Sequence, residues 1–90
     1  MMMIRYQFRF FGLVQGVGFR FYSQTFAKSF QCTGWVQNLP DGSVLMEIQG
    51  DELDIDRVVD SLKSVGHIQI ERIEKKELDL KQETTFDYRF

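Results

Sequence analysis

The stretch GLVQGVGFR, residues 12–20, joins a segment with the alternating pattern of a strand to a segment with the period of a helix. Two of its glycines and Arg20 therefore lie at a strand-to-helix turn, where the first N–H groups of a helix have no partner within it. These groups and the positive end of the helix dipole attract anions, and glycine lets the backbone curve closely around one. Arg20 adds a guanidinium whose paired donors match two oxygens of a phosphate. The stretch predicts a phosphate-binding loop.

Regular patterns on both sides of this stretch predict the remaining elements. Tyr6, Phe8 and Phe10 alternate with polar residues as in a half-buried strand, and from residue 21 to about 31 aromatic residues recur every four positions, as on one face of a helix. Further along, the patterns predict a strand over 32–38, a tight turn at 39–42, a strand over 44–48, a helix capped by Asp51 and ended by Gly66, a strand from 68 with a bulge near Arg72, and a last strand over 86–90. This order indicates an α+β, ferredoxin-like βαββαβ sandwich, in which an antiparallel sheet of four strands plus a short C-terminal strand carries two helices on one face.

The predicted topology brings a second polar residue toward the glycine-rich loop. In this fold the first two strands run parallel with the third between them, so their C-terminal ends share one edge of the sheet, roughly 10 Å apart. Asn38, the last residue of the second predicted strand, is therefore expected to face the loop and Arg20. A gap of that size suits one phosphate and one water.

The composition limits the classes of protein to which the chain can belong. Its 90 residues, 43% hydrophobic and 27% charged, predict one globular domain over 1–90. A formal net charge of −2 argues against general nucleic-acid binding, and no apolar run is long enough for a membrane span. The single cysteine, Cys32, excludes an intrachain disulfide and fits a reducing compartment, and the first residues lack the apolar core of a signal peptide. We expect a monomer in the cytoplasm.

Two motifs in order along the chain closely resemble the acylphosphatases: GLVQGVGFR at 12–20 and GWVQNLPDGSV at 34–44. The ending FDYRF at 86–90 is similar to the closing strand of that family, so the resemblance covers the whole chain. It implies a metal-independent enzyme that needs no cofactor and hydrolyses the carboxyl–phosphate bond of a small-molecule acyl phosphate. The products would be a carboxylate and inorganic phosphate.

The resemblance also implies a role for particular residues. Arg20 matches the catalytic arginine that grips the phosphoryl group, and Asn38 matches the catalytic asparagine that holds the attacking water. The surrounding phosphate-binding backbone is formed by Gln15, Gly16, Val17, Gly18 and Phe19. The chain departs from the family pattern at Gly66-His67, where many members have Gly-Pro, and at Gln37, where arginine is common.

Structural roles and other functions compete with these assignments. Phe19, Tyr22, Phe26 and Phe30 fit a core better than a substrate contact; Cys32 is expected to be buried and inert, and Asp41 to stabilise its turn. His67 is far from the loop in sequence, which argues against a catalytic role. The main alternative function is a phosphate- or anion-sensing module of the same fold without catalysis. RNA binding is disfavoured because the third strand, residues 43–48, offers no stacking aromatics or basic residues.

Overall fold

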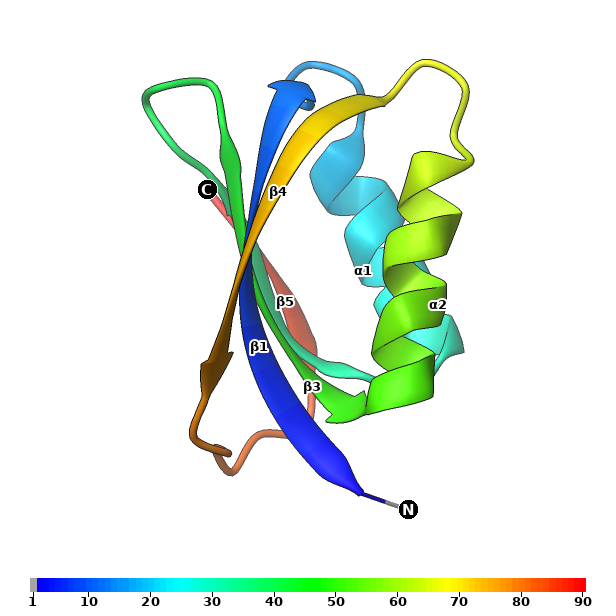
Figure 1. Ribbon diagram of the computed structural model, residues 1–90, viewed down its shortest axis with the longest axis vertical. Coiled ribbons are helices and arrows are strands. Elements are labelled where there is room, and N and C mark those ends of the chain that lie inside the picture. The colour runs from blue at the N-terminus through cyan, green and yellow to red at the C-terminus, as the bar shows by residue number, and fades with distance from the viewer. Residues whose placement is uncertain (1) are drawn as a thin grey trace.

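The computed structural model describes residues 2–90 as a five-stranded sheet with two helices packed on one face (Figure 1). Along the chain the elements are β1 (Met3–Leu13), α1 (Phe19–Ser29), β2 (Thr33–Asn38), β3 (Val44–Asp51), α2 (Glu52–Lys63), β4 (Gln69–Leu78) and β5 (Phe86–Arg89). This order confirms the predicted βαββαβ arrangement with a short additional strand at its end. Neither helix is long and apolar enough to cross a membrane, within the part of the chain described.

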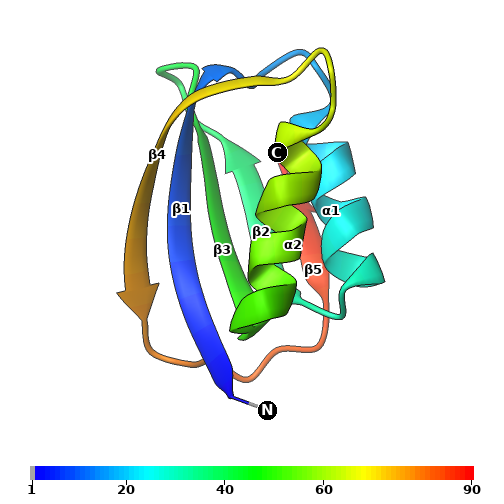
Figure 2. The ribbon, with the colours of Figure 1, turned by 45° about the vertical axis from the view of Figure 1, so that its right-hand side comes forward.

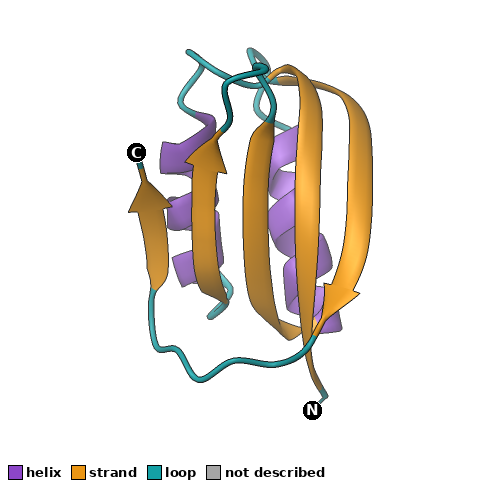
Figure 3. Cartoon of the chain, turned by 90° about the vertical axis from the view of Figure 1, so that its left-hand side faces the viewer, coloured by secondary structure: helices purple, strands orange, loops and turns teal. Residues whose placement is uncertain are grey.

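The strand order across the sheet is β4-β1-β3-β2-β5. Both β1 and β2 pair antiparallel with β3, so they run parallel to each other and end at the same side of the sheet, as predicted. The prediction of an antiparallel sheet was wrong for one pair, because β2 and β5 are parallel and the sheet is mixed. The reason is the connection over 79–85, which passes the end of the sheet where β2 begins, so that β5 starts beside β2 and follows its direction (Figure 3).

The core lies between the sheet and the two helices (Figure 2). Tyr6, Phe8 and Phe10 alternate toward this side of β1 and are buried there. They meet the apolar stripe of α2, whose buried residues are Ile55, Val58, Val59 and Leu62, as their spacing predicts. Burial of each large apolar side chain stabilises the fold by about 1.5–3 kcal/mol, so this two-layer contact is the main source of stability.

The opposite face of the sheet is partly covered, which the alternating pattern did not predict. Arg5 belongs by alternation to the polar side of β1, yet it is fully buried. Its Nε donates a 3.1 Å hydrogen bond to Glu47 Oε1 on β3, and its guanidinium is also paired with Glu83 from the 79–85 connection. The buried arginine therefore fastens the connection that leads into β5.

Several bounds of helices and strands differ from the prediction, among them the end of β3, which lies at Asp51 instead of residue 48. Helix α1 begins at Phe19 and ends at Ser29, two residues before the predicted positions, because Gly18 caps its start and Gln31 takes a left-handed conformation with φ of 58°. Strand β4 continues to Leu78 through a charged segment, since an edge strand exposes these residues to water on both faces. The predicted bulge is confirmed at Glu71, which is skipped between the pairs Phe11–Arg72 and Gly12–Ile70.

Candidate active site

The connection between β1 and α1 forms a tight loop over residues 14–18. Gly16 has φ of 75° and Gly18 has φ of 80°, in the left-handed region that side-chain-bearing residues disfavour. Gly18 is the N-cap residue of α1, makes no side-chain cap and is followed by a first turn without acidic residues. The start of this helix therefore lacks the groups that normally neutralise its dipole.

The backbone N–H groups of this loop remain free to bind an external acceptor. Within residues 2–90, no hydrogen bond has an N–H of residues 15–19 as its donor. The first helical bond begins only at Tyr22, whose N–H donates to Gly18 O at 2.9 Å. Unpaired N–H groups at the start of a helix favour an anion, so the loop has the donors that the sequence predicted.

Arg20 stands in the first turn of α1 and is oriented by β5. One Nη1–H donates to the backbone oxygen of Arg89 at 2.7 Å, and the guanidinium carbon lies 4.4 Å from the centre of the Tyr88 ring. A guanidinium carries five N–H donors, so most of them stay available for a ligand. Stacking on Tyr88 fixes the plane of the charged group before any ligand arrives.

Asn38 ends β2 and faces the same space as Arg20. Its Oδ1 is buried and has no hydrogen-bond partner within the described residues. A buried acceptor left without a donor costs about 1–3 kcal/mol. A water or ligand hydroxyl donating to Oδ1 would remove that cost, so the side chain is suited to hold a bound hydrogen-bond donor.

The β2–β3 turn is tied to the loop through the side chain of Gln15. Its Nε2 donates 2.8 Å hydrogen bonds to the backbone oxygens of Leu39 and Ser43. Asp41 accepts from the hydroxyl and the N–H of Ser43 and also pairs with Arg9, and these contacts lower its pKa to about 2. The predicted turn-stabilising role of Asp41 is confirmed, and the network fixes the turn that follows Asn38.

A pocket of about 140 Å³ lies where these elements meet. The charge of its lining is suited to an anion, since Arg20 is its one charged residue and no carboxylate contributes to it. A water occupies roughly 30 Å³ in the liquid, so the space can accept a phosphoryl group together with a water. The lining consists of Val14, Gly16, Gly18, Phe19, Arg20, Asn38 and Tyr88.

The structure thus brings together most of the predicted site residues and adds others. Gly16, Gly18, Phe19, Arg20 and Asn38 line the pocket, whereas Gln15 and Val17 belong to the loop without lining it.

Sequence reasoning missed Tyr88 as a support for Arg20, although the closing strand FDYRF was a signal that could have pointed to it. It also missed His67, whose ring lies 2.9 Å from Val17 O and for which the sequence carried no signal of proximity.

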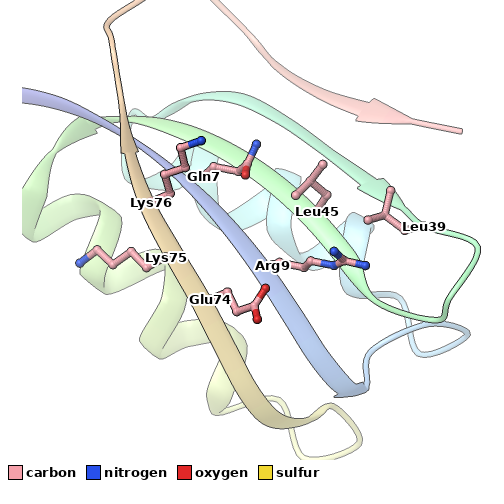
Figure 4. Close-up of a pocket in the computed structure, with 7 residues that line it drawn as sticks. All are labelled: Gln7, Arg9, Leu39, Leu45, Glu74, Lys75 and Lys76. Atoms are coloured by element: carbon pink, nitrogen blue, oxygen red, sulfur yellow. The ribbon is translucent and has the colours of Figure 1, made fainter.

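A larger hollow on the open face of the sheet lacks these features. Its volume is about 340 Å³, and Figure 4 shows its side chains on β1, β3 and β4 and at Leu39 in the β2–β3 turn. Arg9 there is engaged by Asp41 and Ser43, and Glu74 adds a carboxylate. No group of three His, Cys, Asp or Glu in residues 2–90 is arranged to hold a metal ion. Size alone therefore does not identify the site, whereas free amides and an unpartnered acceptor do.

Comparisons with known proteins agree with this geometry. Residues 6–88 match the family model described as Acylphosphatase. The chain is 43% identical over 77 residues to an acylphosphatase of Clostridium perfringens, covering 84% of this chain and 86% of that protein. It is 37% identical over 71 residues to one of Methanospirillum hungatei, covering 77% and 78%. The crystal structure of an acylphosphatase from Bacillus subtilis superimposes with a TM-score of 0.90 at 30% identity, covering 99% of this chain and 100% of that one.

Proposed function

Because this chain belongs to the acylphosphatase family and hydrolyses acyl phosphates, we propose that the pocket between the 15–20 loop and Asn38 carries out the reaction. The loop N–H groups and Arg20 hold the phosphoryl oxygens, and Asn38 holds the water that attacks phosphorus. The observation that carries this assignment is the buried Asn38 Oδ1, which has no partner in residues 2–90 and lines the same pocket as Arg20.

The chemistry needs positioning and charge stabilisation more than acid or base catalysis. The leaving group is a weakly basic carboxylate, so the bond between phosphorus and the acyl oxygen breaks without a protein acid. Arg20 and the loop N–H groups stabilise the charge on the phosphoryl oxygens and are already oriented before the reaction. A bond forms between the water oxygen and phosphorus while the carboxylate leaves.

Asn38 suits the water because an amide accepts and donates hydrogen bonds without adding negative charge. An aspartate at this position would repel the phosphoryl oxygens. No side chain in the pocket lining is a carboxylate, histidine or lysine that could act as a base. The proton of the water therefore passes to a phosphoryl oxygen. We expect the profile of kcat against pH to show no protein pKa near 7, and such a pKa would contradict this step.

The test is Asn38→Ala, with hydrolysis of acetyl phosphate and binding of inorganic phosphate measured in parallel. Loss of one such group in the transition state costs on the order of 3 kcal/mol, or about a hundredfold in rate. We expect kcat to fall to that extent while the Kd for phosphate stays within about twofold. A tenfold weaker phosphate affinity with unchanged kcat would contradict the water-holding role.

We also propose that residues 1–90 act as a single domain and as a monomer in the cytoplasm. The unpaired, buried Cys32 supports a reducing compartment. The edge strand β4 carries six charged residues over 71–77, which discourages pairing with the edge of a second copy. Light scattering on the purified protein tests the monomer, and a dimer at micromolar concentration would contradict it.

A further inference from the structure

His67 lies beside the phosphate-binding loop although it is about fifty residues away in sequence. It follows α2 in the connection to β4, which reaches the same end of the molecule as the β1–α1 loop (Figures 1 and 2). Its Nε2 is 2.9 Å from the backbone oxygen of Val17. A carbonyl oxygen only accepts hydrogen bonds, so this contact requires a proton on Nε2.

Two sets of contacts keep His67 in place. The Ile68 N–H donates to Val65 O at 3.0 Å, and Ile68 itself is buried, so the backbone on the C-terminal side of His67 is anchored. The imidazole ring lies 5.8 Å from the Tyr22 ring, measured between centres, and Tyr22 comes from α1. The side chain is therefore held against the helix that the loop precedes.

The accepting carbonyl belongs to the peptide group between Val17 and Gly18. In a trans peptide the C=O and the N–H point in opposite directions. A hydrogen bond from His67 to Val17 O therefore directs the N–H of Gly18 the opposite way within the peptide plane, away from His67. Gly18 lines the anion pocket whereas Val17 does not, as expected if this N–H is directed toward a bound phosphate.

This peptide group would otherwise rotate easily. It joins Val17 to Gly18, and its rotation changes ψ of Val17 and φ of Gly18. Gly18 is at positive φ, and glycine adopts several backbone conformations at low cost. No backbone hydrogen bond in residues 2–90 has Val17 O as its acceptor. The contact from His67 is thus the interaction that selects one orientation of the peptide.

We propose that His67 is a positioning residue that holds the Val17–Gly18 peptide with its N–H toward the phosphate. The inference rests on the proposed role of the loop N–H groups as phosphate ligands. It gives a polar function to the position at which the sequence departs from the Gly-Pro pattern. His67 acts only through Val17 O and touches no reacting atom.

The experiment compares His67→Phe with His67→Gln. Phenylalanine keeps a ring against Tyr22 but has no donor, whereas glutamine carries an N–H at a similar reach. A net hydrogen bond of ordinary strength predicts that His67→Phe weakens the affinity for inorganic phosphate and lowers kcat/KM about three- to tenfold. We expect His67→Gln to restore both within about twofold of the native chain.

Ser64→Ala is the matched control in the same connection. Ser64 Oγ donates to Ser61 O and lies outside the loop contact, so its loss is expected to leave phosphate affinity unchanged. Unfolding in urea is measured without phosphate for every variant. A purely structural role would lower stability in His67→Phe without changing the affinity of the folded protein.

The inference is overturned if His67→Phe binds phosphate and turns over as the native chain does. It is also overturned if His67→Gln is as impaired as His67→Phe. Arg20→Ala, measured alongside, separates this inference from the proposed function. If Arg20→Ala loses phosphate affinity and His67→Phe does not, only the role of His67 fails; if Arg20→Ala keeps its affinity, the proposed site fails as well.

Discussion

The two helices of this protein both follow a strand, yet their first turns are built in opposite ways. At α2 the side chain of Asp51 accepts a 3.0 Å hydrogen bond from the N–H of Leu53, and Glu52 and Asp54 place negative charge in the first turn. At α1 the N-cap is Gly18, no side chain caps the helix, and Arg20 places positive charge in the first turn.

This difference shows that the chain itself stabilises the start of α2, whereas the start of α1 leaves its N–H groups available for a ligand. A capping side chain and first-turn acids satisfy the free N–H groups and the dipole, and each contributes to stability. The start of α1 has neither a capping side chain nor an acidic residue in its first turn, and the positive charge of Arg20 opposes the helix dipole. An anion in the pocket would supply the missing acceptor and the missing negative charge together.

The largest effects are expected at Arg20, even when its positive charge is kept and only the shape of the charged group is changed. In Arg20→Lys an ammonium cannot reproduce the forked donors or the stacking on Tyr88. Steady-state hydrolysis of acetyl phosphate should fall at least about a hundredfold, or on the order of 3 kcal/mol, nearly as far as in Arg20→Ala. Arg57→Lys, an exposed position on α2, should stay within about twofold. Retention of most activity in Arg20→Lys would contradict a bidentate contact between the guanidinium and the phosphoryl oxygens.

Phosphate itself should stabilise the fold through the α1 end. A ligand at a hundred times its Kd raises the free energy of unfolding by about 2.7 kcal/mol when it binds only the folded state. Urea unfolding with and without phosphate should show this gain for the native chain and for Asp51→Ala. The gain should be lost in Arg20→Ala. An equal gain in Arg20→Ala would place the bound anion elsewhere.

Replacement of the α1 cap residue should disturb both stability and binding. In Gly18→Ala the backbone keeps φ near 80° and the new Cβ lies 3.3 Å from Tyr22 Cε2. The left-handed conformation alone costs a residue with a side chain about 1–2 kcal/mol. Thermal unfolding should show a lower Tm, and phosphate titration should show a weaker affinity for phosphate. Gly66→Ala is the control, because nothing lies within 4 Å of its added Cβ.

The smallest effect should come from the α2 cap, and it should be confined to stability. Asp51→Ala removes the acceptor for Leu53 N–H, which typically costs about 1 kcal/mol. Urea unfolding should reveal this loss, while kcat and the Kd for phosphate remain at native values. A weaker phosphate affinity in this variant would show that the two helix ends are not independent.

Local chemistry explains why much of this fold could be predicted from the sequence. The alternation at Tyr6, Phe8 and Phe10 and the stripe of α2 depend only on the periods of strands and helices, and both are found buried. The glycine loop was equally predictable, because the residues that permit left-handed backbone are adjacent in the chain. Strand topology then sufficed to bring Asn38 to the pocket opposite that loop.

What only the tertiary structure decided are the contacts between distant segments that no local pattern encodes. Four contacts belong to this class: the parallel pairing of β5 with β2, the burial of Arg5 beneath the 79–85 connection, the stacking of Tyr88 under Arg20, and the hydrogen bond from His67 to Val17 O. Each depends on where a connection returns to the sheet, which follows from packing of the whole chain. The sequence by itself therefore determined the elements and the loop, and the packed structure determined how that loop is oriented.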